Sequence, residues 1–115
     1  MNLSEETEKN ISQLQLFEQN LQNLISQRQN FQMQELEIDH ALEALQSTKD
    51  APFKIVGGIM IATTKEELQK ELNSKKELLS MRIRSIELQE QNLKQKAESL
   101  QQIIVKDLQK EEGKK

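Results

Sequence analysis

Residues 53–68 of the 115-residue chain read FKIVGGIMIATTKEEL, and they are its most informative stretch about the fold. Two short runs rich in β-branched residues, 53–56 and 59–62, stand on either side of Gly57-Gly58. A Gly-Gly pair between such runs is typical of a β-hairpin with a primed two-residue turn, because that turn favours positive φ. A turn of this length fixes the register, so we expect the pairs Val56 with Ile59, Ile55 with Met60, Lys54 with Ile61, and Phe53 with Ala62.

Both faces of the expected hairpin, residues 53–63, are apolar. Paired residues share a face, so one face shows Val56, Ile59 and Ile61, and the other shows Phe53, Ile55, Met60 and Ala62. An isolated two-stranded hairpin is marginal in water, and its open edges accept further strands. We therefore expect the hairpin to join hairpins of other subunits in a shared sheet or barrel. The residues expected at these subunit contacts are Phe53, Ile55, Val56, Ile59, Met60 and Ile61.

The segment after the hairpin, residues 64–112, predicts a long helix. Thr64 and Glu67 fit a capping box, in which each side chain accepts the backbone N–H of the other residue. One unbroken seven-residue row consists of Leu72, Leu79, Ile86, Leu93 and Leu100. The second row expected beside it is weak: it holds Leu68, Lys75, Arg82, Gln89, Lys96 and Ile103, while Ile83, Ala97 and Ile104 lie one position away.

The segment before the hairpin, residues 4–46, predicts another long helix, with Ser4 as its N-cap. Its two apolar rows consist of Leu14, Leu21 and Leu42, and of Phe17, Leu24, Phe31, Ile38 and Leu45. Arg28 and Glu35 interrupt the first row, and a polar loop ending at Pro52 separates this helix from the hairpin. We therefore expect one mainly α domain, residues 1–115: a long antiparallel two-helix coiled coil joined by one β-hairpin.

Composition argues against several classes of function. Only 35% of the residues are hydrophobic, which is too few for a thick globular core. With no Cys, a single His (His40) and no Gly-rich phosphate loop, we expect no enzyme, no cofactor and no metal site. A net charge of −3 argues against nucleic-acid binding, and no apolar run approaches the roughly 18 residues of a membrane span. The first residues lack the features of a signal peptide, so we expect a cytoplasmic protein.

The order of a long helix, a Gly-centred hairpin ending in TTKEEL (63–68) and a second long helix resembles the β-type subunits of prefoldin. The stretch FKIVGGIMIATTKEEL looks like the archaeal form, although Ala62 stands where the family often has Lys. The resemblance implies an ATP-independent chaperone, a hexamer of two α-type and four β-type subunits whose hairpins build a double β-barrel body. Coiled-coil arms hang from that body, hold non-native client proteins with their tips and deliver them to a chaperonin.

The resemblance also gives a role to apolar residues near the two ends of the chain. Ile103-Ile104-Val105 cannot all face one partner helix, because consecutive helical side chains point about 100° apart. Such surplus apolar surface suits contact with unfolded clients. The expected client-binding residues are Ile11, Leu14, Leu16, Phe17, Leu100, Ile103, Ile104, Val105 and Leu108. The alternative is that these residues only wrap the last turns of the coiled coil.

A structural or adaptor coiled coil without chaperone activity is the alternative function. Such a protein would share the apolar rows, but it has no need of an apolar hairpin. Polar replacements of Ile55 and Ile59 separate the two hypotheses. A barrel-built hexamer should dissociate, whereas a simple coiled coil should keep its oligomeric state.

Overall fold

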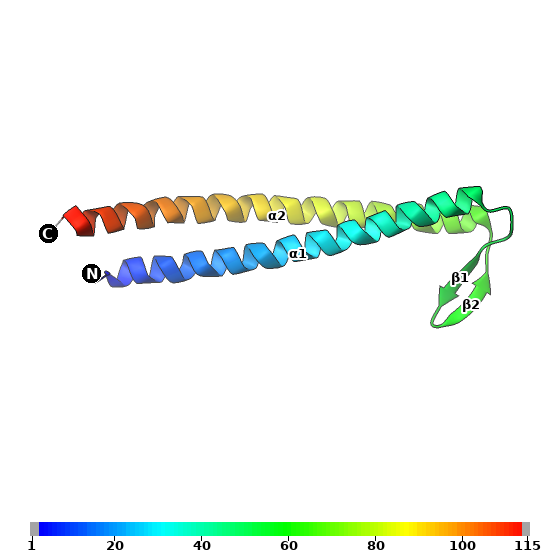
Figure 1. Cartoon of the computed structure of the whole chain (residues 1–115), viewed down its shortest axis with the longest axis horizontal. Helices are drawn as coiled ribbons and strands as arrows, with labels where there is room; N and C mark the ends of the chain where they lie inside the picture. The colour runs from blue at the N-terminus through cyan, green and yellow to red at the C-terminus, as the bar shows by residue number, and fades with distance from the viewer. Residues whose placement is uncertain (1–2, 114–115) are drawn as a thin grey trace. The chain divides into compact units, whose positions relative to one another are not determined.

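The described residues of the chain form two long helices and one two-stranded antiparallel sheet (Figure 1). The computed structural model describes residues 3–113. Helix α1 spans Glu5–Ser47, strand β1 Phe53–Val56, strand β2 Ile59–Ala62 and helix α2 Lys65–Gly113. The expected ranges, 4–46, 53–63 and 64–112, differ from these bounds by no more than one residue at either end. The expected fold class, two long helices joined by one β-hairpin, is therefore the one observed.

Hydroxyl side chains cap both helices. The Thr7 amide donates to Ser4 Oγ at 3.1 Å, and the Glu67 amide donates to Thr64 Oγ1 at 3.1 Å. Each bond satisfies one of the amides that a helix leaves unpaired at its start. The second half of the expected capping box differs: the Glu67 carboxylate accepts the Thr63 hydroxyl at 3.3 Å. The carboxylate thus holds the residue that links β2 to α2.

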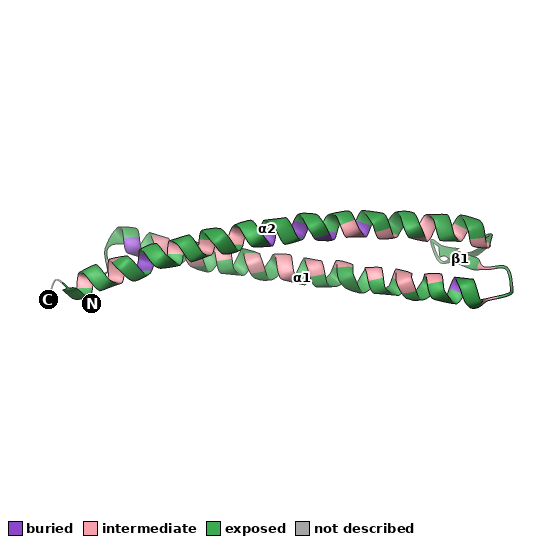
Figure 2. Cartoon of the chain, turned by 90° about the horizontal axis from the view of Figure 1, so that it is seen from above, coloured by how far each residue is buried: buried purple, intermediate pink, exposed green. Residues whose placement is uncertain are grey.

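The chain divides into two compact units, and the division falls within both helices. The terminal unit comprises, of the described residues, 3–28 and 85–113. The hairpin unit comprises residues 29–84, and so contains β1 and β2. Figure 2 shows buried and half-buried positions recurring at regular intervals along both helices.

In the terminal unit the two helices run antiparallel and share an apolar seam. Antiparallel pairing follows from two contacts: the Ser4 amide donates to Glu111 Oε1 at 3.1 Å, and Arg28 Nε donates to Glu90 Oε2 at 2.8 Å. The start of α1 therefore lies beside the end of α2. Apolar seam residues of this unit, buried or half-buried, include Leu14, Phe17, Leu21 and Leu24 of α1 and Ile86, Leu93, Ala97, Leu100 and Ile104 of α2.

The hairpin unit continues the same kind of packing. Leu45, Leu79 and Ile83 are its most buried apolar residues, each 7% exposed. Ser80 Oγ donates to Glu35 Oε2 at 2.9 Å, so one of the polar interruptions of α1 meets a hydroxyl of α2. Phe31 is half-buried, and the Arg82 guanidinium carbon lies over its ring, 5.7 Å from the ring centroid, which is a cation–π contact between α1 and α2.

The second row of α2 corrects the sequence-based prediction. Of the expected positions, Leu68 is half-buried, whereas Lys75, Arg82, Gln89, Lys96 and Ile103 are all exposed. The buried or half-buried row lies one residue further on and consists of Lys76, Ile83, Glu90, Ala97 and Ile104. Heptad seams step by three or four residues, and a step of four from the leucine row brings in three apolar side chains. A step of three would have buried a run of cations instead.

The hairpin has the predicted register, with Val56 opposite Ile59 and Phe53 opposite Ala62. Its turn residues Gly57 and Gly58 have φ of 57° and 79°, as a primed turn requires. The Thr63 amide donates to the Pro52 carbonyl at 3.1 Å, which extends the pairing beyond the ends of the strands.

Candidate functional site

The first candidate surface is the hairpin itself. All six residues expected at subunit contacts are exposed, from 41% at Ile61 to 73% at Ile55. We call these residues the hairpin surface: Phe53, Ile55, Val56, Ile59, Met60 and Ile61. Two strands cannot shield both of their faces, so the local fold itself leaves this apolar area in water. A surface of this kind marks an interaction site.

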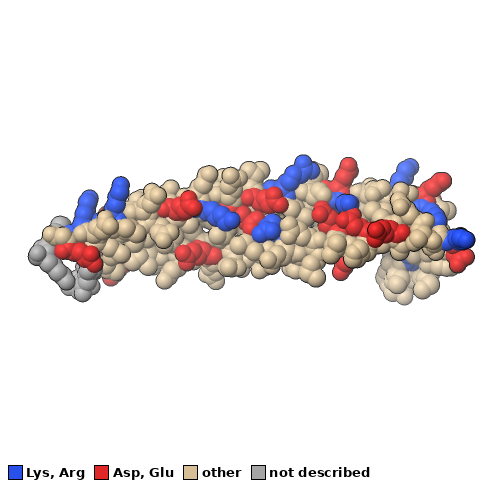
Figure 3. Space-filling model, turned by 45° about the horizontal axis from the view of Figure 1, so that its top comes forward, with Lys and Arg blue, Asp and Glu red and all other residues tan. Residues whose placement is uncertain are grey.

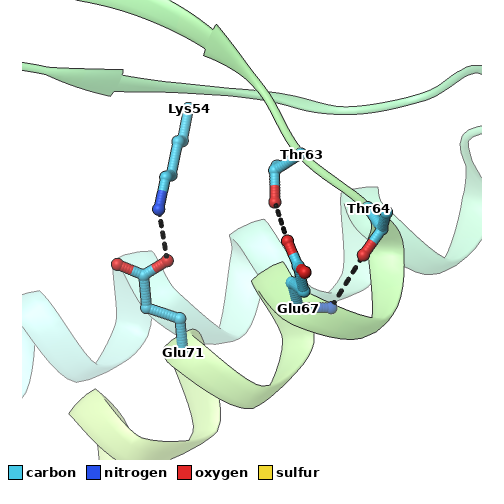
Figure 4. A network of polar contacts seen from close by, with 5 residues as sticks. All are labelled: Lys54, Thr63, Thr64, Glu67 and Glu71. Atoms are coloured by element: carbon cyan, nitrogen blue, oxygen red, sulfur yellow. Dashed lines mark hydrogen bonds and ion pairs between the residues drawn. The ribbon is translucent and has the colours of Figure 1, made fainter.

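Polar contacts tie the base of the hairpin to the first two turns of α2 (Figure 4). Lys54 Nζ lies 3.5 Å from Glu71 Oε2. The Thr63 hydroxyl donates to Glu67 Oε2, and the Glu67 amide donates to the Thr64 hydroxyl. The hairpin is therefore attached to α2 by side chains as well as by the chain itself.

The second candidate surface lies in the terminal unit, where α1 begins and α2 ends. Leu16, Ile103 and Val105 are exposed, at 48%, 48% and 45%. The structure leaves five more of the expected client-binding residues half-buried: Ile11, Leu14, Phe17, Leu100 and Leu108. The ninth, Ile104, is 6% exposed and belongs to the seam, as the 100° step between neighbours requires. We call the three exposed residues, Leu16, Ile103 and Val105, the terminal surface.

The surroundings of the terminal surface mix apolar and amide side chains. An open hollow is lined by Phe17, Leu100 and Ile103 together with Gln13, Asn92, Gln95, Lys96 and Ser99. Val105 borders a second open hollow with Gln101, Gln102 and Gln109 among its neighbours. Both hollows lie open to solvent and present small apolar areas among amide and charged side chains, the charged ones being Lys96 in the first hollow and Glu98 and Lys106 in the second.

The comparisons with known proteins agree with this arrangement. The family model described as prefoldin subunit matches residues 8–111. The chain belongs to the prefoldin family. Prefoldin subunit beta of Methanospirillum hungatei is 34% identical, covering 99% of this chain and 94% of that protein. Prefoldin subunit beta of Pyrococcus abyssi is 33% identical, covering 90% of both chains.

A solved prefoldin structure has the same fold. The crystal structure of the prefoldin beta subunit from Thermococcus strain KS-1 matches with a TM-score of 0.84 and 30% identity, covering 90% of this chain and 92% of that chain. Prefoldin is a chaperone family whose members are not known as enzymes, and its beta subunits form hetero-oligomers with alpha-type subunits. The chain is therefore a prefoldin-type chaperone subunit.

Charges in this prefoldin subunit are mixed rather than gathered. Figure 3 shows acidic and basic side chains interspersed over the face in view. Lys76 pairs with Asp39 across the seam of the hairpin unit. The hydrogen bond to the Asp39 carboxylate, together with the charge of that carboxylate, raises the pKa of Lys76.

The described part of this prefoldin subunit holds no cluster of His, Cys, Asp or Glu side chains that could bind a metal ion. His40 is exposed on α1. Between residues 3 and 113, neither helix has a stretch long and apolar enough to cross a membrane.

Sequence reasoning assigned no role to five further exposed apolar residues. These are Met33, Leu36, Leu78, Met81 and Leu88, each more than half exposed. Their signal in the sequence was their position outside the seven-residue rows, which places an apolar side chain on the face away from the partner helix.

Proposed function

We propose that this chain is the β-type subunit of an ATP-independent holdase. Two α-type and four β-type subunits form the hexamer, and their hairpins build its barrel body. The terminal surfaces capture non-native proteins and pass them to a chaperonin in the cytoplasm. The reaction uses no cofactor, no nucleic acid and no membrane.

One observation carries the proposal: the hairpin surface is exposed on both faces. Burying an apolar side chain of this size stabilises a complex by roughly 1.5–3 kcal/mol when burial is complete. Six such side chains per subunit supply a strong drive toward assembly. An adaptor coiled coil would not need an apolar hairpin surface, because its helices alone would hold it together.

Client holding follows from weak contacts repeated in one assembly. Each terminal surface offers only Leu16, Ile103 and Val105, and their exposure is moderate. Several copies acting on one unfolded chain raise the effective concentration of contacts, so the total affinity greatly exceeds that of one surface. Apolar contact of this kind is tolerant of sequence, and a competing binder can release the client without nucleotide hydrolysis.

The test is suppression of aggregation. A denatured protein is diluted without ATP into the assembly with an α-type subunit, and light scattering is followed. The triple variant Leu16→Ser, Ile103→Ser, Val105→Ser should need about tenfold more assembly for half-suppression, because every copy loses its apolar contacts. Sedimentation should show that this variant still assembles.

Leu88→Ser is the matched control, since Leu88 is 61% exposed in the same unit and lies outside the proposed set. It should suppress aggregation within about twofold of the unsubstituted chain. An equal loss in Leu88→Ser would show that holding is not confined to the terminal surface. If no assembly suppresses aggregation, the adaptor function replaces the holdase.

A further inference from the structure

Lys54 is the one charged residue among residues 53–62. Its pairing with Ile61 places it on the face that also carries Val56 and Ile59. Figure 4 shows Lys54 directed from β1 toward α2, where its Nζ lies 3.5 Å from Glu71 Oε2. The face that carries Lys54 is therefore turned toward its own α2 at the base of the hairpin.

Exposure distinguishes the two faces at that base. Ile61, opposite Lys54, is 41% exposed and is the least exposed member of the hairpin surface. On the other face, Phe53, Ile55 and Met60 are 59%, 73% and 67% exposed. Nearer the turn, Val56 and Ile59 of the Lys54 face are also exposed, at 51% and 65%, so the contrast between the faces is clearest at the base, where Ile61 is 41% exposed and Phe53 59%.

A second contact strengthens the same orientation. Glu67 and Glu71 are four residues apart and therefore lie on one face of α2. Glu67 accepts a hydrogen bond from the hydroxyl of Thr63, and Glu71 pairs with Lys54, so β1 and the residue that follows β2 are tied to the same side of the helix. A lone lysine in an assembling sheet would lose water, and a carboxylate of its own chain offsets that loss.

We propose that Lys54–Glu71 is a positioning contact that selects which face of the hairpin enters the assembly. It ties the Lys54 face to α2 of the same chain at the base of the hairpin only, and it presents the face with Phe53, Ile55 and Met60 to the hairpin of a second copy of this chain. The presented face carries no charge, so two copies meet without like-charge repulsion. This inference rests on the proposed function, because it needs hairpins that assemble.

Cysteine labelling tests the choice of face. The chain has no Cys, so Met60→Cys and Ile61→Cys each introduce one thiol, and the two adjacent residues report opposite faces of β2. Maleimide labelling is measured in the complex with an α-type subunit and in the separated chain. Assembly should slow labelling at position 60 by about tenfold, and by at least about threefold more than at position 61.

Charge reversal tests the positioning contact. Lys54→Glu and Glu71→Lys each place like charges together, and each should weaken assembly by about three- to fivefold in sedimentation or native mass measurements. The double variant restores an opposite-charge pair and should recover assembly. It should also recover the difference in labelling between positions 60 and 61, which each single reversal reduces.

The Asp39–Lys76 pair supplies the matched control. It is also a surface Lys–carboxylate pair, with the Lys76 side chain 40% and the Asp39 side chain 43% exposed, and it lies between α1 and α2 rather than at the hairpin. Reversal of either charge there should leave the ratio of labelling at positions 60 and 61 unchanged.

Two results, each obtained with a complex that assembles, would overturn this inference and leave the proposed function intact. One is equal protection of positions 60 and 61. The other is a double variant as weak as Lys54→Glu, which would place the partner of Lys54 in another subunit. Failure of the unsubstituted chain to assemble with an α-type subunit would overturn the proposed function, and the inference with it.

Discussion

At residue 90 a carboxylate lies in the seam of the terminal unit. Glu90 is 5% exposed, and its Oε2 accepts a hydrogen bond from Arg28 Nε at 2.8 Å. The two side chains differ in their access to water: 27% of the Arg28 side chain is exposed, against 7% of the Glu90 side chain. Replacement of the arginine removes the ion-pair partner of a buried carboxylate, whereas replacement of the glutamate leaves a guanidinium that still reaches solvent.

The Arg28–Glu90 pair should therefore respond asymmetrically to substitution. Arg28→Leu should lower the free energy of unfolding by about 2–3 kcal/mol, and Glu90→Leu by about 1 kcal/mol. The double leucine variant should be more stable than Arg28→Leu, because no unpaired charge remains. Urea unfolding at one fixed protein concentration measures all three values. Equal losses in the two single variants would contradict this account.

The Lys76–Asp39 contact predicts a dependence of stability on alkaline pH. The ordinary pKa of Lys76 is 10.5, and the contact raises it in the folded state. The stabilisation is therefore fully present below the unfolded pKa and is lost as pH rises through the folded value. The difference in melting temperature between the wild type and Asp39→Asn should be constant near neutral pH and shrink above about pH 10.5. A difference that stays constant there would contradict the assignment.

The Arg28–Glu90 pair also shows which contacts can be predicted from the sequence and which cannot. Arg28 is recognisable in the sequence as an interruption of an apolar row, but its partner is not. Glu90 stands one position beyond Gln89, which the predicted second row of α2 had placed in the seam. Both rows satisfy heptad spacing, and the observed row keeps Lys75, Arg82 and Lys96 out of the seam while it buries Glu90.

Among the elements, the hairpin depends most on its turn. Gly57 and Gly58 have φ of 57° and 79°, and a Cβ at either position would meet nothing within 4 Å. The turn therefore has room for a side chain at both positions. Glycine is favoured because of the positive φ values alone, which disfavour a β-branched residue most and asparagine least.

Substitution of Gly57 should separate backbone strain from packing. Gly57→Val should destabilise the hairpin by about 1–2 kcal/mol, whereas Gly57→Asn should stay within about 0.5 kcal/mol of the wild type. Amide hydrogen exchange of β1 and β2 in the assembled protein measures the difference. Equal exchange in the two variants would mean that the turn does not limit the stability of the hairpin.

The elements differ in how far the sequence determines them. The register of β1 and β2 follows from a two-residue turn, because Gly57-Gly58 leaves one alignment of the flanking runs. The leucine row of α2 is equally direct. The second row of α2 is harder to predict. Ile83 and Ile104 favour a row four residues after the leucine row, whereas Leu68 and Ile103 fit a row three residues after it. At the start of α2, Thr64 accepts the Glu67 amide as predicted, but the Glu67 carboxylate accepts from Thr63, a neighbour that the capping-box pattern does not include.

For the whole molecule, the sequence predicts which surfaces are apolar better than it predicts what they contact. The hairpin surface can be predicted because successive residues of a strand point to opposite faces, and both FKIV and IMIA place apolar residues on each face. The terminal surface is narrower than the sequence suggests, because Ile104 turns into the seam while Ile103 and Val105 remain outside it. Apolar composition near a helix end does not reveal which of three consecutive residues faces water. That choice again depends on the row that α2 buries.

Substitutions in the hairpin surface should therefore abolish assembly, whereas those in the terminal surface should weaken client holding and leave assembly intact. Ile55→Ser with Ile59→Ser removes one large apolar side chain from each face of the hairpin, so the hexamer should dissociate while helical content is kept. Met33→Ser with Leu36→Ser is the matched control, since those residues are 63% and 55% exposed on α1. Sedimentation should find the control assembled and the hairpin variant dissociated. An unchanged oligomeric state in the hairpin variant would favour a simple coiled coil, because contacts along the helices alone would then hold the assembly.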